Sequence, residues 1–323
     1  MEQTTLGGTE LRVGVAGLGC GGSSRLGMRT EKSRAQSVAV LRTALDLGVN
    51  LVDTAAAYGT EEIVGEGIAA VRRESVIISS KARAHKDGEE IPFPPTDLIE
   101  SLEASLGRLG TDYIDVFHVH GVLPQHYEHV RENVVPLLLA EKCKGKIRHL
   151  GITEFAAMDP GQGMLRRAVE DDCWEVMMVA FHMLNQKPRE QVFAHTQRQN
   201  IGTLLMYAVR AIFSRPERLR EAMRELAADG RVPESFASGD NPLDFLIHDG
   251  GAESVIDAAY RYARHEPGVD VVLTGTGDID HLRANVASIL KPPLPTADLE
   301  TLETLFGGLE DVGLDRPTPA QSN

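Results

Sequence analysis

The 323-residue sequence predicts an α/β protein of the (β/α)₈, or TIM-barrel, class, formed as a single domain with an enlarged loop after the seventh strand. Short apolar runs rich in β-branched residues alternate with longer segments of helical period, which is typical of βα units on a parallel sheet. Eight such runs are present, and eight parallel strands close into a barrel, whereas doubly wound sheets usually have fewer. The length also suits a barrel, which typically needs roughly 250 residues.

The expected strands are short and rich in valine, isoleucine and other apolar residues. In chain order they are 13–17, 50–53, 76–80, 114–118, 149–152, 176–181, 203–207 and 269–274. The segments between them carry apolar residues at three- and four-residue spacing and include 37–47, 61–71, 96–109, 130–144 and 164–170. Segment 96–109 shows the helical pattern most clearly, because four leucines form one stripe and Gly110 follows as the stop.

Two segments depart from the regular spacing. Segment 214–251 is longer than a βα connection, contains three prolines and includes an expected helix over 218–228. We expect this segment to line the substrate pocket together with the loops around 20–26 and 83–95. The barrel is expected to span about residues 1–291. A C-terminal extension, 292–323, follows with one helix over 299–306 and a polar end without regular structure.

The formal net charge is −14 and the pI is about 5.3, so the surface potential disfavours nucleic acid and anionic lipid as partners. The three cysteines, Cys20, Cys143 and Cys173, are too scattered for a disulfide framework or a metal site, which fits a reducing cytoplasm. The N-terminus lacks a basic stretch followed by an apolar one, and no apolar run approaches the roughly 20 residues of a membrane span. We therefore expect a cytoplasmic protein with a small-molecule partner, and no sequence feature indicates an oligomeric state.

Gly17, Gly19 and Gly22 form a G-x-G-x-x-G pattern after the first expected strand, which is the pattern of a Rossmann dinucleotide site. That site needs a helix that opens at the third glycine, but segment 23–34 is polar and basic and has no apolar stripe. The context therefore favours a flexible loop at the top of the first strand. There the backbone of Gly19 and Cys20 can approach a bound cofactor.

Four chemically active side chains follow successive strands. Asp53 ends the second expected strand, and Tyr58 lies in the loop after it. Lys81 closes the third strand, and His120 lies just beyond the fourth. The C-terminal ends of barrel strands meet at one face, so we expect these side chains to lie together. The arrangement closely resembles the aldo-keto reductase family, in which a strand-two aspartate is followed by Thr-Ala and, five residues on, by Tyr-Gly. The resemblance runs from about residue 6 to residue 285, and segment 145–152 resembles the family's approach to its fifth strand.

The resemblance implies an NAD(P)(H)-dependent oxidoreductase. It would transfer a hydride between a nicotinamide cofactor and an aldehyde or ketone, or the corresponding alcohol or sugar hydroxyl. In that chemistry Tyr58 is the general acid, and Lys81, held by Asp53, stabilises the phenolate and lowers the tyrosine pKa. His120 orients the carbonyl oxygen. His118 lies two residues earlier on the same face of the strand and is expected deeper in the barrel.

Taken singly, each of these side chains also has a structural explanation, such as a plain ion pair between Asp53 and Lys81. Their joint occurrence across three strands favours catalysis. A second class of function is a cofactor-binding regulatory subunit with little turnover, because some relatives of this fold serve channels as accessory proteins. A barrel hydrolase that uses Asp53 with Glu61 or Glu62 is disfavoured, because no second carboxylate is anchored at a neighbouring strand end.

The resemblance also implies which positions contact the cofactor, either NADP(H) or NAD(H). They are Gly19, Cys20, Asp53, Thr153, Glu154, Met178, Met206, Tyr207, Thr274, Gly275, Thr276, Gly277, Asp278, His281 and Asn285. Glu154 and Met178 stand where an asparagine and a glutamine usually hold the nicotinamide carboxamide, and we expect Glu154 to accept from its amine. Met206 stands where an aromatic residue usually stacks on the ring. Either Met206 or, through a one-residue shift, Tyr207 is expected to cover the nicotinamide.

Segment 274–282 contains no Lys or Arg, although family members that prefer NADP(H) commonly clamp its 2′-phosphate with basic residues there. Asp278 and Asp280 would disfavour a phosphate, and a ribose hydroxyl could donate to Asp278. His281 stands where the family often has an arginine, and Arg283 should point about 200° around the helix from it. We therefore expect NAD(H) to work at least comparably to NADP(H). In the alternative, both aspartates only cap the following helix.

Overall fold

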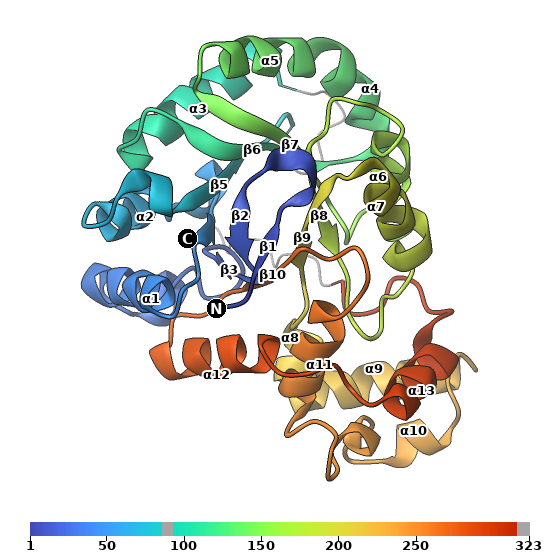
Figure 1. Cartoon of the computed structure of the whole chain (residues 1–323). Helices are drawn as coiled ribbons and strands as arrows, with labels where there is room; N and C mark the ends of the chain where they lie inside the picture. Colours follow the sequence, from blue (N-terminus) through green and yellow to red (C-terminus); the bar gives the residue numbers. More distant parts are fainter. Residues whose placement is uncertain (86–92, 315–323) are drawn as a thin grey trace.

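Eight parallel strands close into a barrel at the centre of the molecule (Figure 1). The computed structural model describes residues 1–85 and 93–314. The strands follow one another round the barrel in the order β10-β3-β4-β5-β6-β7-β8-β9, which confirms the predicted (β/α)₈ class. Their bounds are β3 Ala16–Gly19, β4 Leu51–Asp53, β5 Ile77–Ala82, β6 Ile114–Val122, β7 Ile147–Glu154, β8 Val176–Ala180, β9 Gly202–Met206 and β10 Val271–Thr274.

The expected first strand, 13–17, is wrong as a single barrel strand. Its first part belongs to β2 Arg12–Gly14, which pairs with β1 Gln3–Thr5 in an antiparallel hairpin, and its second part belongs to β3. The Asn50 side chain, just before β4, fixes β2 at the N-terminal end of the barrel, because it accepts from one backbone amide of β2 and donates to one of its carbonyls, both at 2.8 Å. Both parts are equally apolar, so periodicity alone does not separate them.

The hairpin closes the N-terminal end of the barrel. Leu6, Leu11 and Val13 are at most 4% exposed and join one apolar cluster with side chains from the first residues of the barrel strands. Each buried leucine of this kind contributes roughly 1.5–3 kcal/mol to stability. The backbone N–H of Gly7 also donates to the Asp270 carboxylate at 3.2 Å, just before β10. The accessible end of the barrel is therefore the opposite one, where the strands end.

Helices surround the barrel and alternate with its strands (Figure 1). Their bounds are α1 Arg34–Asp46, α2 Glu61–Ile68, α3 Pro95–Leu109, α4 Tyr127–His129, α5 Val135–Cys143, α6 Gly163–Ala168, α7 Ala194–Gln199, α11 Val255–Arg264 and α12 Ile279–Ile289. The chain after β3 enters its helix at a capping box formed by Ser33 and Gln36, well beyond Gly22. This late helix start and the closed barrel exclude the Rossmann alternative.

The expected helix 130–144 is divided. Val130–Val134 form a π-helical segment, and α5 begins at Val135. Pro136 accounts for the break, because it has no N–H and cannot complete the helical bond to the carbonyl of Glu132. The π-helical segment continues directly from α4, on the connection that leaves β6.

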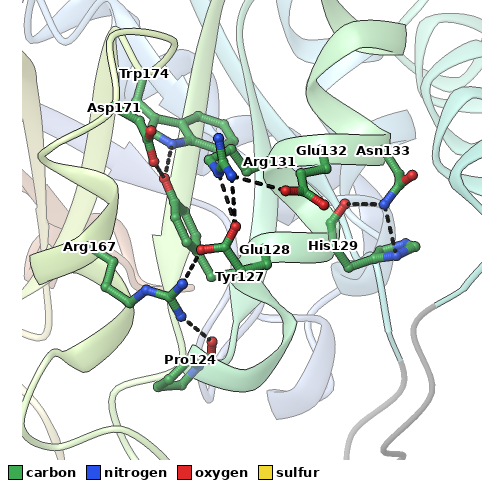
Figure 2. A network of polar contacts seen from close by, with 10 residues as sticks. All are labelled: Pro124, Tyr127, Glu128, His129, Arg131, Glu132, Asn133, Arg167, Asp171 and Trp174. Carbon is green, nitrogen blue, oxygen red and sulfur yellow. Dashed lines mark hydrogen bonds and ion pairs between the residues drawn. The ribbon is translucent and has the colours of Figure 1, made fainter.

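A polar network fixes α4 against its neighbours (Figure 2). The Trp174 indole N–H donates to the Tyr127 hydroxyl at 3.0 Å, and that hydroxyl donates to Asp171. Glu128 accepts from the Arg167 guanidinium, so α4 is tied to α6 as well. Because Tyr127 is buried, these bonds hold in place the chain segment that follows the C-terminal end of β6.

The enlarged loop after β9 forms a helical layer beside the barrel (Figure 1). It contains α8 Ala211–Ser214, α9 Pro216–Ala228, α10 Ser235–Ser238 and the 3₁₀ turn Asp244–Leu246. From the C-terminal extension, α13 Thr296–Phe306 packs on this layer, with the ring centroids of Phe306 and Phe236 6.3 Å apart. The chain then returns to the barrel, where Leu314 packs against Ala180 at the end of β8.

The expected polar end of the tail, 315–323, and part of the expected pocket loop, 86–92, lie outside the described residues. Elsewhere in the chain, none of the described helices combines the length and the apolar character that a membrane crossing requires. In those same ranges, no three His, Cys, Asp or Glu side chains are grouped so that they could hold a metal ion. Cys20, Cys143 and Cys173 are free thiols, and Cys20 is buried.

Candidate active site

The four side chains expected to carry the chemistry lie together at the C-terminal end of the barrel. Asp53 is the last residue of β4, and Tyr58 ends the 3₁₀ turn that follows it. Lys81 and His120 lie near the ends of β5 and β6. They meet because β4, β5 and β6 are consecutive neighbours in the barrel.

A buried ion pair forms the base of the site. Lys81 Nζ lies 2.6 Å from Asp53 Oδ1 and donates to the carbonyl of Thr54 at 2.9 Å, and both charged side chains are almost completely buried. The Ser79 hydroxyl also donates to Asp53 Oδ1, at 2.8 Å, and His118 Nε2 lies 3.1 Å from the same hydroxyl. Ser79 was not among the expected residues. The available signal was its position two residues before Lys81, which places it on the same face of β5.

His118 lies deeper in the barrel than His120, as expected, and is fully buried. Burial and the nearby Lys81 charge hold its pKa well below the usual value, so the ring is neutral. Gly151 on β7 makes room for this ring, because a Cβ built there would lie 2.2 Å from His118 Nδ1. The glycine is therefore required by close packing against the imidazole.

Tyr58 directs its hydroxyl towards His120. Its oxygen lies 3.5 Å from His120 Nε2, and the two rings meet edge to face with centroids 5.6 Å apart. Burial and the Asp53 charge raise the pKa of Tyr58 well above 10. The net direction is opposite to the expected lowering, because burial and the Asp53 charge outweigh the positive charge of Lys81 beside the ring. Tyr58 is consequently a neutral phenol that holds a proton.

His120 is neutral as well. Burial is the main reason that its pKa lies well below 6.5, and the positive charges of Lys81 and Arg83 add to the effect. A neutral imidazole carries one N–H donor and one acceptor nitrogen. Next to a phenol, His120 can therefore form a second hydrogen bond to an oxygen atom that approaches Tyr58.

Thr153 and Glu154, the last two residues of β7, make different contacts. The Thr153 hydroxyl accepts from the backbone N–H of Gly121 at 2.7 Å and so holds the residue that follows His120. Glu154 Oε1 accepts from the backbone N–H of Ala180 at 2.7 Å, while Oε2 is buried without a partner among the described residues. Burial raises the pKa of Glu154 to about 8. At neutral pH this side chain is therefore mainly a protonated acid.

Replacing Glu154 by Gln is expected to remove a pH dependence of stability. As the pH rises, the Glu154 carboxyl loses its proton near pH 4.5 in the unfolded chain and only near pH 8 in the folded chain. The free energy of unfolding of the wild type therefore decreases as the pH rises from 4.5 to 8. Glutamine keeps the shape and does not titrate. In urea unfolding, the wild type and Glu154→Gln should have similar stability near pH 4.5. At pH 8.5 the variant should be more stable than the wild type by on the order of 3 kcal/mol. A stability difference that is the same at both pH values would contradict this assignment.

Methionines replace the polar and aromatic residues expected from the resemblance at two positions. Met178 is 2% exposed and belongs to the apolar cluster inside the barrel, so it offers packing rather than a hydrogen bond. Met206 and Tyr207 both pack beside Leu314 and Ala180 at the mouth. Tyr207 has a φ of +73°, which is unusual for a residue with a side chain, and the Arg210 guanidinium lies 4.0 Å from its ring centroid. That stacking fixes the ring.

The glycine-rich loop after β10 is packed against the loop after β3. A Cβ on Gly275 would lie 2.8 Å from the carbonyl oxygen of Gly19, and one on Gly277 would lie 2.3 Å from Gly27 Cα. These glycines are thus required by contact between the two loops. Asn285 of α12 donates to the Thr274 hydroxyl at 3.0 Å and holds the start of the loop.

Asp278 is the N-cap of α12. Its Oδ1 accepts from the backbone N–H groups of Asp280 at 2.9 Å and His281 at 3.0 Å, which is the capping alternative considered for this residue. Lys32, from the loop after β3, is close enough to lower the pKa of Asp278, although the main cause is the hydrogen bond from His281. The sequence pattern of 274–282 did not reveal this cation, because Lys32 reaches the loop from a distant part of the chain.

Comparison with known proteins agrees with this arrangement. The sequence pattern of the Aldo/keto reductase family matches residues 17–306. The chain is 27% identical over 312 residues to the uncharacterized oxidoreductase YqkF of Bacillus subtilis, covering 94% of this chain and 96% of that protein.

Two solved structures share the fold. Aldo-keto reductase AKR11C1 from Bacillus halodurans has a TM-score of 0.72 at 21% identity, and an aldo-keto reductase from Klebsiella pneumoniae in complex with NADPH has a TM-score of 0.68 at 23% identity. Each likeness covers 98% of this chain and 100% of the other. At these identities the structural likeness establishes the fold, and the sequence match establishes the family. The chain belongs to the aldo/keto reductase family.

Proposed function

We propose that the protein is a single-domain NAD(P)(H)-dependent oxidoreductase that interconverts a small aldehyde or ketone and the corresponding alcohol or sugar hydroxyl. The observation that carries the proposal is the pairing of the Tyr58 hydroxyl with His120 above the buried Lys81–Asp53 ion pair. A proton donor, a neutral imidazole and a fixed positive charge are the groups that protonation of a carbonyl oxygen requires. The NADPH complex of the Klebsiella pneumoniae relative supports the choice of cofactor.

The residues at the mouth fit a nicotinamide cofactor. Glu154 Oε2, which has no partner within residues 1–85 and 93–314, offers a hydrogen-bonding position for the carboxamide. Tyr207, held by Arg210, offers an aromatic face, and Met206 offers a thioether beside it. In this proposal the loop 274–278 and Asn285 hold the adenosine end. When bound, the cofactor supplies or accepts the hydride at the carbonyl carbon.

In the reducing direction, Tyr58 donates its proton to the carbonyl oxygen as negative charge develops there. The raised pKa of Tyr58 keeps the phenol protonated until that point. His120 donates an N–H to the same oxygen and orients it. Lys81 Nζ lies 5.3 Å from the centroid of the Tyr58 ring, so its charge stabilises the phenolate that remains. In alcohol oxidation the phenolate takes the proton back.

Steady-state turnover with NADH and NADPH over a panel of aldehydes, sugars and steroids tests the proposal. Turnover of any carbonyl compound that depends on a nicotinamide cofactor supports an enzyme. Tight cofactor binding without turnover across the whole panel would support the other class of function, a cofactor-binding regulatory subunit. Cofactor binding should be measured by titration alongside the kinetic assays, so that a lack of turnover is not confused with a lack of bound cofactor.

For cofactor preference, we expect wild-type kcat/KM with NADH to be at least comparable to that with NADPH. The Asp278 carboxylate at the start of α12 opposes a 2′-phosphate, which carries about −1.5 to −2 charges. Asp278→Ser keeps a capping side chain and removes the charge, so it should shift the ratio of kcat/KM values towards NADPH by a few-fold to about tenfold. Lys32→Gln should shift this ratio of kcat/KM values towards NADH. A wild-type preference of a hundredfold or more for NADPH would contradict the expectation.

A further inference from the structure

Positive charge gathers beside the candidate catalytic residues, although the net charge of the protein is −14. Arg83 acts electrostatically on both Tyr58 and His120, and Arg25 interacts with Tyr58. Neither arginine takes part in the proton transfer proposed above. Arg83, which follows β5, and Arg25, in the loop after β3, both act electrostatically on Tyr58, and guanidinium groups near a reaction centre are suited to hold an anionic group of a ligand.

Strand register places Arg83 beside His120. Ala82, the last residue of β5, pairs with Val119 on β6, so the next residues along the two strands, Arg83 and His120, are neighbours at the mouth of the barrel. Two residues later, His85 is buried and its Nε2 donates at 2.9 Å to the carbonyl of the residue that follows His120. The backbone on both sides of Arg83 is therefore fixed, and with it the position from which the half-buried Arg83 side chain extends.

Arg25 lies in a strained turn after β3. Arg25 and Leu26 have φ values of +46° and +56°, a region that residues with side chains seldom adopt. Leu26 is fully buried and anchors the turn. Burial and the like charge of Arg29 lower the pKa of Arg25, whereas Tyr58 raises it. An anion beside Arg25 would therefore be stabilising.

The carboxylate with the largest effect on Tyr58 is Asp53, and it is already bonded to Lys81 at 2.6 Å. The Lys81–Asp53 pair is neutral as a unit. Beyond this pair, Arg83 is the permanently charged group with the largest effect on both Tyr58 and His120.

Arg83 stands on the side of the barrel mouth opposite the expected nicotinamide position. In the ring of eight strands, β5 lies four strands from β9 in either direction, and Tyr207 follows β9. The glycine-rich loop and α12, which are expected to hold the adenosine end, follow β10. Arg83 is therefore placed to meet the substrate and not the cofactor phosphates.

We propose that the site accepts carbonyl compounds that carry a carboxylate or phosphate group, and that Arg83, assisted by Arg25, binds this group while the carbonyl oxygen meets Tyr58 and His120. The inference rests on the proposed oxidoreductase function and names its substrate class. A guanidinium forms paired, charge-assisted hydrogen bonds with either anion. In the reduction, hydride bonds to the carbonyl carbon, the π electrons of the C=O bond move to oxygen, and the Tyr58 proton completes the alcohol. The anionic group is unchanged.

Two pairs of aldehydes that differ in charge test the inference. They are 4-carboxybenzaldehyde against its methyl ester, and glyceraldehyde 3-phosphate against glyceraldehyde. In at least one pair, wild-type kcat/KM should favour the anion by roughly tenfold to a hundredfold, the size expected for hydrogen bonds to a charged group. Arg83→Gln should reduce that preference about tenfold, mainly through the KM of the anion. The preference is a ratio of two kcat/KM values, so an effect of the lost charge on Tyr58 and His120, which both members share, cancels in it. Arg83→Lys should retain part of the preference.

Arg12→Gln is the matched control, because Arg12 lies on the hairpin at the opposite end of the barrel. It should leave the preference unchanged. For Arg25→Gln, the cofactor dissociation constant is measured as well. An increase in this constant with an unaltered anion preference would show that Arg25 does not bind the anionic group of the substrate. Equal kcat/KM for charged and neutral members in the wild type, or a preference that Arg83→Gln does not alter, overturns the inference and leaves the proposed function intact. No turnover of any of the four aldehydes, while another compound of the panel turns over, also overturns the inference and leaves the proposed function intact.

Discussion

Tyr58→Phe is expected to lower kcat by roughly 10² to 10⁴ and to leave the cofactor dissociation constant nearly unchanged. The substitution removes the hydroxyl that lies 3.5 Å from His120 Nε2. It keeps the ring, whose edge is covered by Gly21 so closely that a Cβ on that glycine would come within 2.5 Å of it. The loop should therefore keep its shape, and the kinetic loss should report the missing proton donor. Steady-state kinetics and a cofactor titration provide the two measurements.

Tyr113→Phe provides a matched control for the loss of a phenolic hydroxyl. Tyr113 immediately precedes β6, at the end of the barrel away from the site, where the Arg73 guanidinium lies 4.0 Å from its ring centroid. Its substitution should leave turnover unchanged. If Tyr58→Phe turned over at the wild-type rate, Tyr58 would be eliminated as the acid, and the mechanism proposed here would fail with it.

Lys81→Met is expected to destabilise the protein by about 3–5 kcal/mol and to lower kcat at least a hundredfold. The side chain is fully buried, and its ammonium is bonded to Asp53 and to the Thr54 carbonyl. Without it, the Asp53 carboxylate is left as a buried charge with the Ser79 hydroxyl to stabilise it. Urea unfolding at neutral pH measures the loss of stability, and steady-state kinetics measures the loss of turnover.

The double variant Lys81→Met/Asp53→Asn separates structural from catalytic effects. Removing the second charge should restore much of the lost stability, because no uncompensated charge is then buried, but it should not restore turnover. An active double variant would show that the Lys81 charge is not needed to stabilise the phenolate. A Lys81→Met variant as stable as the wild type would show that Asp53 does not depend on Lys81 for its burial.

The barrel could be predicted because its signal is local. Each strand is an apolar, β-branched run, and the helices between the strands have a clear period. The boundary between β2 and β3 could not be predicted in the same way, because Val13 and Val15 are both apolar and both buried. β2 pairs with β1 and is bonded by the Asn50 side chain from 36 residues along the chain. A long-range hydrogen bond of this kind leaves no trace in local periodicity.

The positions of Asp53, Tyr58 and Lys81 followed from the motif, but the electrostatics of the site did not. The direction of the Tyr58 pKa shift depends on burial and on which partners Lys81 has, and both are properties of the folded chain. Likewise, the sequence left open whether Asp278 caps a helix or meets a ribose, and only the backbone geometry shows the cap. The sequence placed Arg83 in an expected pocket loop but did not single it out, because the strand register, and not its sequence neighbours, brings it beside His120.

The hairpin that closes the barrel also constrains when the protein can become stable during its synthesis. Its residues leave the ribosome early, yet Gly8 bonds to the carbonyl of Asn200 at 2.7 Å and Gly7 bonds to Asp270. Until those partners have been translated, Leu6 and its apolar neighbours have no surface against which to pack. The hairpin is thus made long before the partners on which it packs, and a nascent chain exposes this hydrophobic segment until they have been translated.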